Sequence, residues 1–372
     1  MPILVLLVAL TAAGVVLNTI VATPTVGSEP VDYPTFGQPG ADILTGHWAG
    51  IFSDPIIQAG PFELIFWGIP FLLGVHGLIG WIAFGIVASS LFAVAAAVVA
   101  ERLLRPLTPA WSTPLAVGVA AVAAVSGLLS ASLAAGHPAE VAIPVLWLIA
   151  GALARRGQPL AAAAALAATT GWELWGLLGV PVLLLAPRVD LRTVWRSAVG
   201  GVLVIAVLFL PFALLGPFHM FGYGWVISSN SMAHLLFPTA TSFPWPLRLI
   251  QAVLSVGAGA AVAWLIRRRP DALWLVPLVV CVVRLFTDPV LAGYYAVPPF
   301  LLLLVGVAFS IAQRALVPVL LGLVMVNVLI DVPLSLIPGG ILVVLSAILA
   351  VVIIRRGRAG AVTGVDADAL TS

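Results

Sequence analysis

The polar residues best suited to chemistry gather in one loop, residues 24–61, between two apolar segments. The chain is 62% hydrophobic and 8% charged, yet this loop carries five ionisable side chains and no Arg or Lys. They are Glu29, Asp32, Asp42, His47 and Asp54. Carboxylates and imidazoles are common general acids and bases. The loop therefore indicates a site that handles protons or hydroxyl groups at a membrane surface; the alternative is a solvated connector.

The rest of the chain predicts an integral membrane protein. A membrane helix needs roughly 20 apolar residues, and the 372 residues supply about ten to twelve such segments. We therefore expect one all-α domain, a polytopic bundle of transmembrane helices. The single cysteine, Cys281, excludes an internal disulfide. The basic residues are dispersed in short clusters, which argues against nucleic-acid binding.

Twelve apolar segments are long enough, or nearly so, to be membrane spans. They are residues 3–22, 78–100, 113–134, 140–154, 158–171, 174–187, 197–215, 246–266, 272–288, 294–312, 315–333 and 339–354. The segment 62–75 predicts a partial helix at the outer interface. The pair 158–187 is short for two crossings and favours a shallow hairpin whose apex is TTGWELWG.

Arginine distribution predicts the orientation. All 16 basic residues are Arg, and fourteen of them fall between spans on one side, which the positive-inside rule assigns to the cytoplasm. We expect a multi-pass plasma-membrane protein with both termini cytoplasmic and the active face external. Residues 1–356 form the membrane domain in this prediction, with external loops 24–61 and 216–246. Residues 357–372 are expected to be a disordered cytoplasmic tail.

The two remaining arginines lie toward the expected outer face. Arg284 falls within a span, where ionisable groups are costly and usually functional or paired. Its two interpretations are an ion pair with Asp288, four residues on, and an anion site. Arg248 begins a span and either snorkels to the interface or contacts a lipid phosphate.

Other candidate residues share the expected outer face. The loop 216–246 combines aromatic and small polar residues with His219 and His234, which fits either a sugar pocket or an interfacial aromatic belt. His137 and Glu140 begin the span 140–154, where Glu140 also suits the helix dipole. The spacing of His47, His76 and His137 is irregular, so we predict no metal site from it.

Several of these motifs resemble one family. Asp32-Tyr33-Pro34-Thr35-Phe36, Ala41-Asp42-Ile43-Leu44-Thr45-Gly46 and Ile51-Phe52 resemble the first external loop of polyprenyl-phosphate-dependent glycosyltransferases of the GT-C superfamily. The likeness is greatest to the actinobacterial mannosyl- and arabinosyltransferase branch. Gly136-His137-Pro138, where relatives often have Gly-Gln, and Asp288-Pro289 with Tyr294-Tyr295 are similar to later motifs. Relatives often carry a Lys where this chain has Trp172-Glu173-Leu174-Trp175.

The resemblance implies a GT-C-like fold and an inverting sugar transfer. Asp32 would be the catalytic base, and Arg284 and Arg248 would hold the phosphate of a polyprenyl-phospho-sugar donor. The implied sugar is mannose or arabinose, and an envelope lipid or glycan would accept it. Membrane lipid would surround the protein. The implied sugar or acceptor pocket comprises Asp42, His47, Asp54, His137, Glu140, Glu173, His219, His234, Asp288, Tyr294 and Tyr295. No cofactor is assigned, although a divalent cation is compatible with such a site.

Two other functions fit the sequence. A transporter or flippase would need acids near the bilayer midplane and paired half-repeats, and neither is evident. A non-catalytic relative of the GT-C enzymes would bind a polyprenyl phosphate without turnover. Glu173, at the position where relatives have Lys, favours this second alternative.

Overall fold

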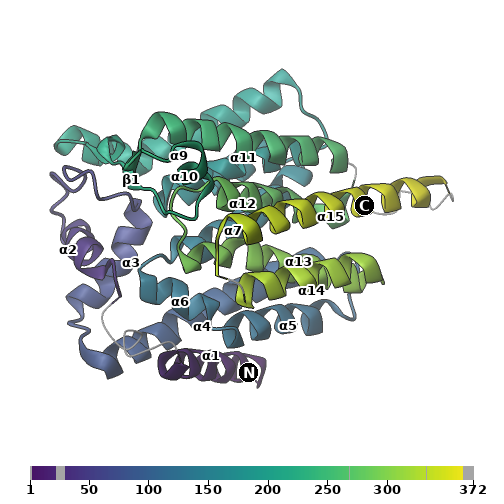
Figure 1. Ribbon diagram of the computed structural model, residues 1–372, viewed down its shortest axis with the longest axis horizontal. Helices are drawn as coiled ribbons and strands as arrows, with labels where there is room; N and C mark the ends of the chain where they lie inside the picture. Colours follow the sequence, from purple (N-terminus) through teal and green to yellow (C-terminus); the bar gives the residue numbers. More distant parts are fainter. Residues whose placement is uncertain (1, 22–29, 268, 332, 363–372) are drawn as a thin grey trace.

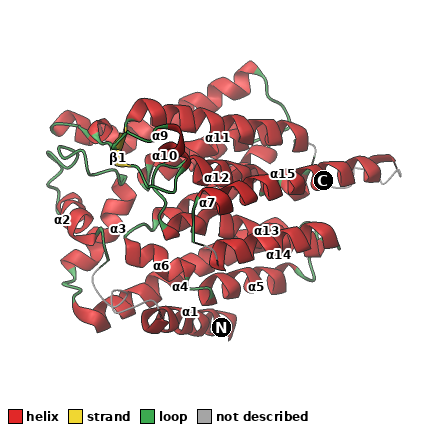
Figure 2. Ribbon diagram, in the orientation of Figure 1, coloured by secondary structure: helices red, strands yellow, loops and turns green. Residues whose placement is uncertain are grey.

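The computed structural model describes residues 2–21, 30–267, 269–331 and 333–362, so Glu29 and Arg268 lie outside the described residues. Helices dominate it (Figure 2). The α-helices of the first half are α1 (Pro2–Val21), α2 (Tyr33–Leu44), α3 (Pro61–Leu72), α4 (Gly77–Leu104), α5 (Ser112–Val125), α6 (Leu128–Ala135), α7 (Ala139–Arg155) and α8 (Pro159–Ala168). Those of the second half are α9 (Leu191–Leu215), α10 (Met232–Leu236), α11 (Trp245–Ile266), α12 (Leu275–Thr287), α13 (Val297–Ala312), α14 (Leu316–Asp331) and α15 (Leu336–Val362).

Short elements connect these helices. The 3-10 helices are η1 (Thr169–Gly171), η2 (Leu174–Leu185), η3 (Met220–Gly222), η4 (Pro270–Ala272) and η5 (Gly293–Ala296). Two strands, β1 (Trp225–Val226) and β2 (Ser242–Phe243), form an antiparallel pair within the loop 216–246. The all-α prediction is therefore confirmed for the described part of the chain.

The apolar segments of the sequence coincide with helices. Five of the described helical segments are long and apolar enough to cross a membrane, or six if the bent pair α5 and α6, which meet at 51°, counts as one span. Shorter apolar helices include α3, α8, η2, α12 and most of α14. The larger expected total of ten to twelve spans stays a prediction. The sequence predicts a disordered tail from residue 357, whereas α15 continues to Val362. Residues 363–372 lie outside the described residues.

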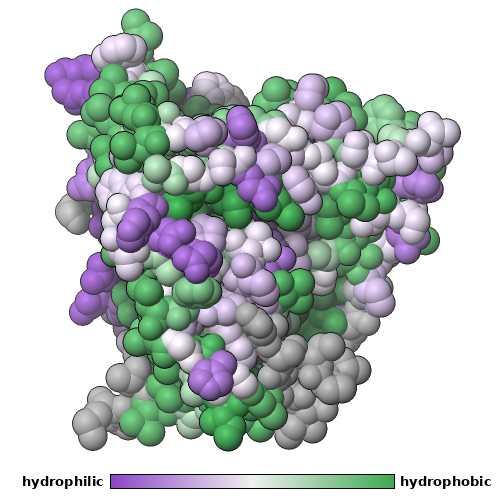
Figure 3. Space-filling view, turned by 90° about the vertical axis from the view of Figure 1, so that its left-hand side faces the viewer, coloured by the Kyte–Doolittle hydropathy of each residue, from purple (hydrophilic) through white to green (hydrophobic). Residues whose placement is uncertain are grey.

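The long helices lie side by side, and the external loops of the prediction gather at one end of the bundle (Figure 1). We call this end, which carries α2, α3, α10 and the β1–β2 pair, the loop end. Figure 3 looks onto it and shows hydrophilic side chains among hydrophobic ones. Helix α1 begins and α15 ends toward the opposite side of the bundle. Both predicted external loops thus belong to one face of the molecule.

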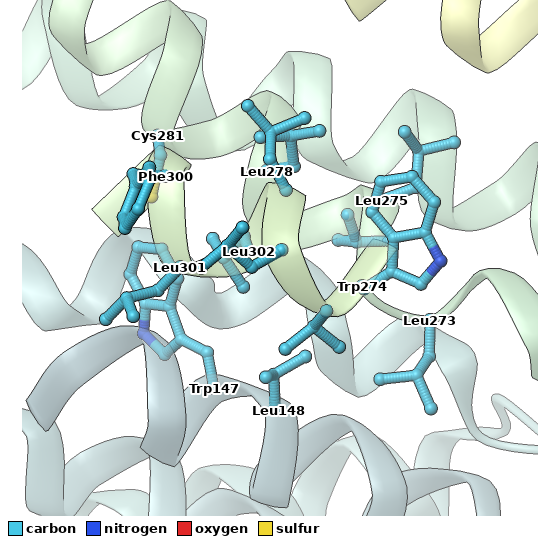
Figure 4. Packing of buried hydrophobic residues seen from close by; sticks show 14 of the residues in the cluster. Trp147, Leu148, Leu273, Trp274, Leu275, Leu278, Cys281, Phe300, Leu301 and Leu302 are labelled. Carbon is cyan, nitrogen blue, oxygen red and sulfur yellow. The ribbon is translucent and has the colours of Figure 1, made fainter. Parts of the chain in front are cut away.

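Helix α13 and its neighbours form the core. Segment 293–312 contains α13, and 83% of its most apolar 18-residue stretch is buried. In α9 the buried fraction of the corresponding stretch is 17%. Leu278 and Cys281 of α12 pack here with Phe300 of α13 and Trp147 of α7 (Figure 4). A helix that exposes apolar residues, as α9 does, is suited to a lipid environment. The interior is therefore a helix-on-helix core inside an apolar outer surface.

A close approach of two glycines positions the loop end. A Cβ atom on Gly40 of α2 would lie 1.8 Å from the Leu64 carbonyl oxygen, and one on Gly68 of α3 would lie 2.3 Å from the Gly40 carbonyl carbon. Small residues let helix backbones come this close in membranes. The α2–α3 contact thereby holds the start of α2, where Asp32 lies, against the bundle.

We expect Gly68→Ala to lower stability by about 1–3 kcal/mol, because overpacked positions force backbone shifts. The thermal midpoint of purified protein in detergent measures this. The matched control is Gly118→Ala in α5, where an added Cβ meets nothing within 4 Å and better helix propensity favours alanine. An unchanged midpoint in Gly68→Ala would contradict the close packing of α2 and α3.

Candidate functional site

The candidate site lies where four segments of the loop end meet: the start of α2, the first turn of α3, the turn between α6 and α7, and the junction of η1 with η2. The Val31 N–H donates to the Ala134 carbonyl at 3.1 Å. Ala59, just before α3, forms an isolated antiparallel bridge with Glu173. The side chains brought together are Asp32, Glu63, His137 and Glu173.

The turn between α6 and α7 sets the position of His137. Gly136 ends α6 with φ +97°, a left-handed conformation that favours glycine. A Cβ there would lie 2.7 Å from Asp32 Cβ, so glycine also lets Asp32 approach. Trp67 donates to the Gly136 carbonyl at 3.0 Å, and the Ser132 hydroxyl donates to the His137 carbonyl at 2.6 Å. The backbone around the imidazole is thus held from both sides.

Both ring nitrogens of His137 face carboxylate oxygens. Nε2 lies 2.8 Å from Asp32 Oδ2 and Nδ1 lies 3.2 Å from Glu173 Oε1. Tyr294 stacks on the ring, with centroids 4.1 Å apart. Burial by itself lowers the pKa of His137, but hydrogen bonds to Asp32 and Glu173 and the charges of Glu173 and Glu63 outweigh it and raise that pKa well above the ordinary value. The turn therefore favours a positive charge between acids.

Glu63 is the unsatisfied member of this group. Its side chain is fully buried, and neither carboxylate oxygen has a hydrogen-bond partner among the described residues. One ligand atom each from Glu63, His137 and Glu173 lie within 4.8 Å of one another. A buried carboxylate without a partner is costly. Neither His47 nor His76 is one of these three residues.

A second cluster centres on Arg284 of α12. Its guanidinium donates two hydrogen bonds of 3.1 Å to the two carboxylate oxygens of Glu140. Asp288 Oδ2, the partner in the ion-pair interpretation of the sequence, is more distant at 3.8 Å from Nε. The guanidinium carbon lies 3.9 Å from the Trp175 ring centroid and 4.7 Å from that of Tyr295. Acids and aromatic rings thus surround Arg284, so the ion-pair interpretation describes it better than an open anion site.

Arg248 belongs to the same cluster but is less fully bonded. It donates to Asp288 Oδ2 at 2.9 Å and to Gln251 at 2.8 Å, and its guanidinium lies 4.3 Å from the Trp225 ring centroid. Its buried Nε–H has no partner among the described residues. Arg248 is therefore less completely paired than Arg284.

Two adjacent tyrosines connect the clusters. Tyr294 stacks on His137, Tyr295 contacts the Arg284 guanidinium, and their own rings meet edge to face at 4.7 Å. The structure thus unites most of the residues that we selected from the sequence. They are Asp32, His137, Glu140, Glu173, Arg248, Arg284, Asp288, Tyr294 and Tyr295.

The other selected residues make local contacts in the loops. Asp42 accepts a hydrogen bond from Gln38, and Asp54 accepts one from the Ile56 N–H. Both line a groove of about 460 Å³ formed by residues 35–57. His47 pairs with Thr45, His219 with the Ser53 carbonyl, and the His234 N–H with Ser231. The contacts of these five residues, of which that of His234 is made by its backbone N–H, lie within the loops around the clusters.

The sequence reasoning missed three residues of the clusters: Glu63, Trp175 and Gln251. Glu63 had a signal, since it is the one acidic residue of the apolar segment 62–75. Trp175 lies in the stretch compared with the family, but its contact with Arg284 has no sequence signal. Gln251 follows Arg248 by three residues, a helical spacing that permits their hydrogen bond.

No protein-family model matches the chain, and no curated protein matches it either.

We expect Arg284→Met to lower stability by about 3–5 kcal/mol, because it leaves Glu140 as an uncompensated buried charge, whereas Asp288 keeps its ion pair with Arg248. Arg284→Met combined with Glu140→Gln should recover part of the loss. Thermal unfolding in detergent measures both. The control is Arg192→Met at an exposed position of α9. Equal midpoints for the two single variants would show that the Arg284–Glu140 pair contributes no stability.

Proposed function

We propose that this protein is an inverting membrane glycosyltransferase that moves a sugar from a polyprenyl-phosphate donor to a hydroxyl of an envelope lipid or glycan. Mannose or arabinose is the proposed sugar, and the proposed site is the loop end, on the external face of the plasma membrane. The helical architecture, the apolar helices and the acid–histidine cluster support this. The GT-C resemblance of the first loop supplies the substrate class.

The observation that carries the proposal is the contact between Asp32 and His137. A catalytic base must be accessible, and the Asp32 side chain is 34% exposed whereas that of His137 is 17% exposed. His137 holds Oδ2, which leaves the second oxygen of Asp32 for an acceptor hydroxyl. A base oriented by a partner is the arrangement that general-base catalysis requires.

In the proposed reaction, Asp32 takes the proton of the acceptor hydroxyl as its oxygen attacks the anomeric carbon. The bond from that carbon to the phosphate oxygen breaks, with inversion, and polyprenyl phosphate leaves. Negative charge then develops on the phosphate, and a fixed cation stabilises it. Arg248 is better suited to that contact than Arg284, because its side chain is 13% exposed against 8% and it is not bound by two carboxylates. Arg284 instead positions Glu140 and Tyr295.

A second candidate is a relative that binds a polyprenyl phosphate without turnover. The observation in its favour is the complete engagement of Arg284 by Glu140, Asp288 and two aromatic rings. Such a protein would keep the fold and the lipid affinity and would lack transfer. A transporter or flippase is the third candidate, and it has no specific support from the clusters.

We expect Asp32→Asn to reduce sugar transfer about 10²–10⁴-fold, the usual contribution of a general base. The assay follows radiolabelled polyprenyl-phospho-mannose and polyprenyl-phospho-arabinose into membrane lipids. The matched control, Glu101→Gln near the end of α4, should transfer as the wild type does. Full transfer by Asp32→Asn would remove Asp32 from the role of base.

The same assay separates the candidates. Wild-type protein that binds polyprenyl phosphate but transfers neither sugar would favour the non-catalytic relative. Movement of a solute or lipid across vesicles containing only this protein would favour the transporter.

A further inference from the structure

We propose that Glu63, His137 and Glu173 bind one divalent transition-metal ion, with Zn²⁺ the best match to their donor atoms. Imidazole nitrogen and carboxylate oxygen are both ligands of Zn²⁺, and the imidazole favours a transition metal over Mg²⁺ or Ca²⁺. The three residues come from α3, the α6–α7 turn and the η1–η2 junction. The Ala59–Glu173 bridge and the hydrogen bond from the Trp67 side chain to the Gly136 carbonyl hold these segments together. The proposal concerns binding and does not depend on sugar transfer.

The first argument is the state of Glu63. It is fully buried and both its oxygens lack hydrogen-bond partners among the described residues, although its ligand atom lies within 4.8 Å of those of His137 and Glu173. Buried charges are normally paired or coordinate metals. A cation between these three residues would satisfy Glu63, which the described protein groups leave unsatisfied.

The second argument is the direction of the His137 hydrogen bonds. Metal-bound histidines almost always donate their other N–H to a carboxylate or carbonyl, which fixes the tautomer. Asp32 lies 2.8 Å from Nε2 and can accept that hydrogen bond. Nδ1 of a neutral imidazole would then direct its lone pair toward Glu173 Oε1 at 3.2 Å. Two lone pairs facing each other repel unless a proton or a metal ion lies between them.

The third argument is distance. Zinc ligands lie about 2.0–2.2 Å from the ion, so two ligand atoms are at most about 4.4 Å apart. The 3.2 Å between His137 Nδ1 and Glu173 Oε1 is within that limit. The other separations are at most 4.8 Å, so the Glu63 carboxylate must approach by up to about 1.4 Å to reach the roughly 3.4 Å that separates ligand atoms of a tetrahedral zinc ion. Three protein ligands leave a fourth position of a tetrahedral ion open to an oxygen; its use by a donor phosphate or an acceptor hydroxyl rests on the proposed function.

The test is Zn²⁺ binding by protein that was purified in detergent and stripped with a chelator, measured by calorimetry without any sugar donor. We expect one ion per chain and a higher thermal midpoint when Zn²⁺ is present. Glu63→Gln and Glu173→Gln should each weaken binding at least about 100-fold, and Asp32→Asn about 10–100-fold, as for outer-shell partners. Glu63→Gln should fold without metal, because it removes an unpartnered charge.

The matched control is His76→Gln, since His76 is exposed before α4 and bonds to the Gly74 carbonyl. It should bind Zn²⁺ as the wild type does. Unchanged binding in both Glu63→Gln and Glu173→Gln, or no binding by the wild type, would overturn the proposal. A proton shared between His137 and its acids would then account for the cluster. Failure of sugar transfer with intact Zn²⁺ binding would contradict only the proposed function.

Discussion

The cost of buried charge is the constraint on which this structure depends. An uncompensated charge in an apolar interior is strongly destabilising, and a paired one is tolerated when its hydrogen bonds are satisfied. The contact of Arg284 with Glu140 meets this requirement through two hydrogen bonds of 3.1 Å. It joins α12 to the first turn of α7, across 144 positions of sequence. These helices must therefore meet in this register, which also aligns the α6–α7 turn with the loop end.

Packing of aromatic side chains determines the positions of the site residues at the loop end. The α2–α3 pair shares an aromatic core with the start of α4, in which Tyr33 of α2 contacts Trp67 of α3 and Trp81 of α4 edge to face. Trp67 also donates to the carbonyl just before His137, so the packing of this small core determines where the imidazole lies. Asp32 immediately precedes Tyr33 and is positioned by the same contacts. The chemistry of the site is thus coupled to the packing of a few large rings.

Much of the fold could be predicted from the sequence, and the pairings within the site could not. Apolar runs and Arg clusters delimit the helices, since both signals are local, and the break between α8 and η2 falls at the expected stretch after Thr169. The ion-pair partner of Arg284 could not be predicted from local sequence. Asp288, at a helical spacing, was the local choice, but tertiary packing brings Glu140 closer. Glu63 was passed over for the same reason, because its burial becomes visible only once α3 folds back over the turn that carries His137.

Under the proposed function, two positions that differ from the GT-C motifs lie close together in space. Those motifs often have Gln at the position of His137 and Lys in the stretch that here contains Glu173. The two positions are 36 residues apart in sequence, yet the side chains lie 3.2 Å apart. A Lys-to-Glu exchange alone would put one more acid beside Asp32 and Glu63 and would raise their mutual repulsion. An imidazole that can carry a proton or a metal ion on the side facing Glu173 offsets that charge. Under the proposed function, His137 and Glu173 therefore act as one unit, in which a fixed ring supplies the positive charge that a flexible amine supplies in the GT-C motifs.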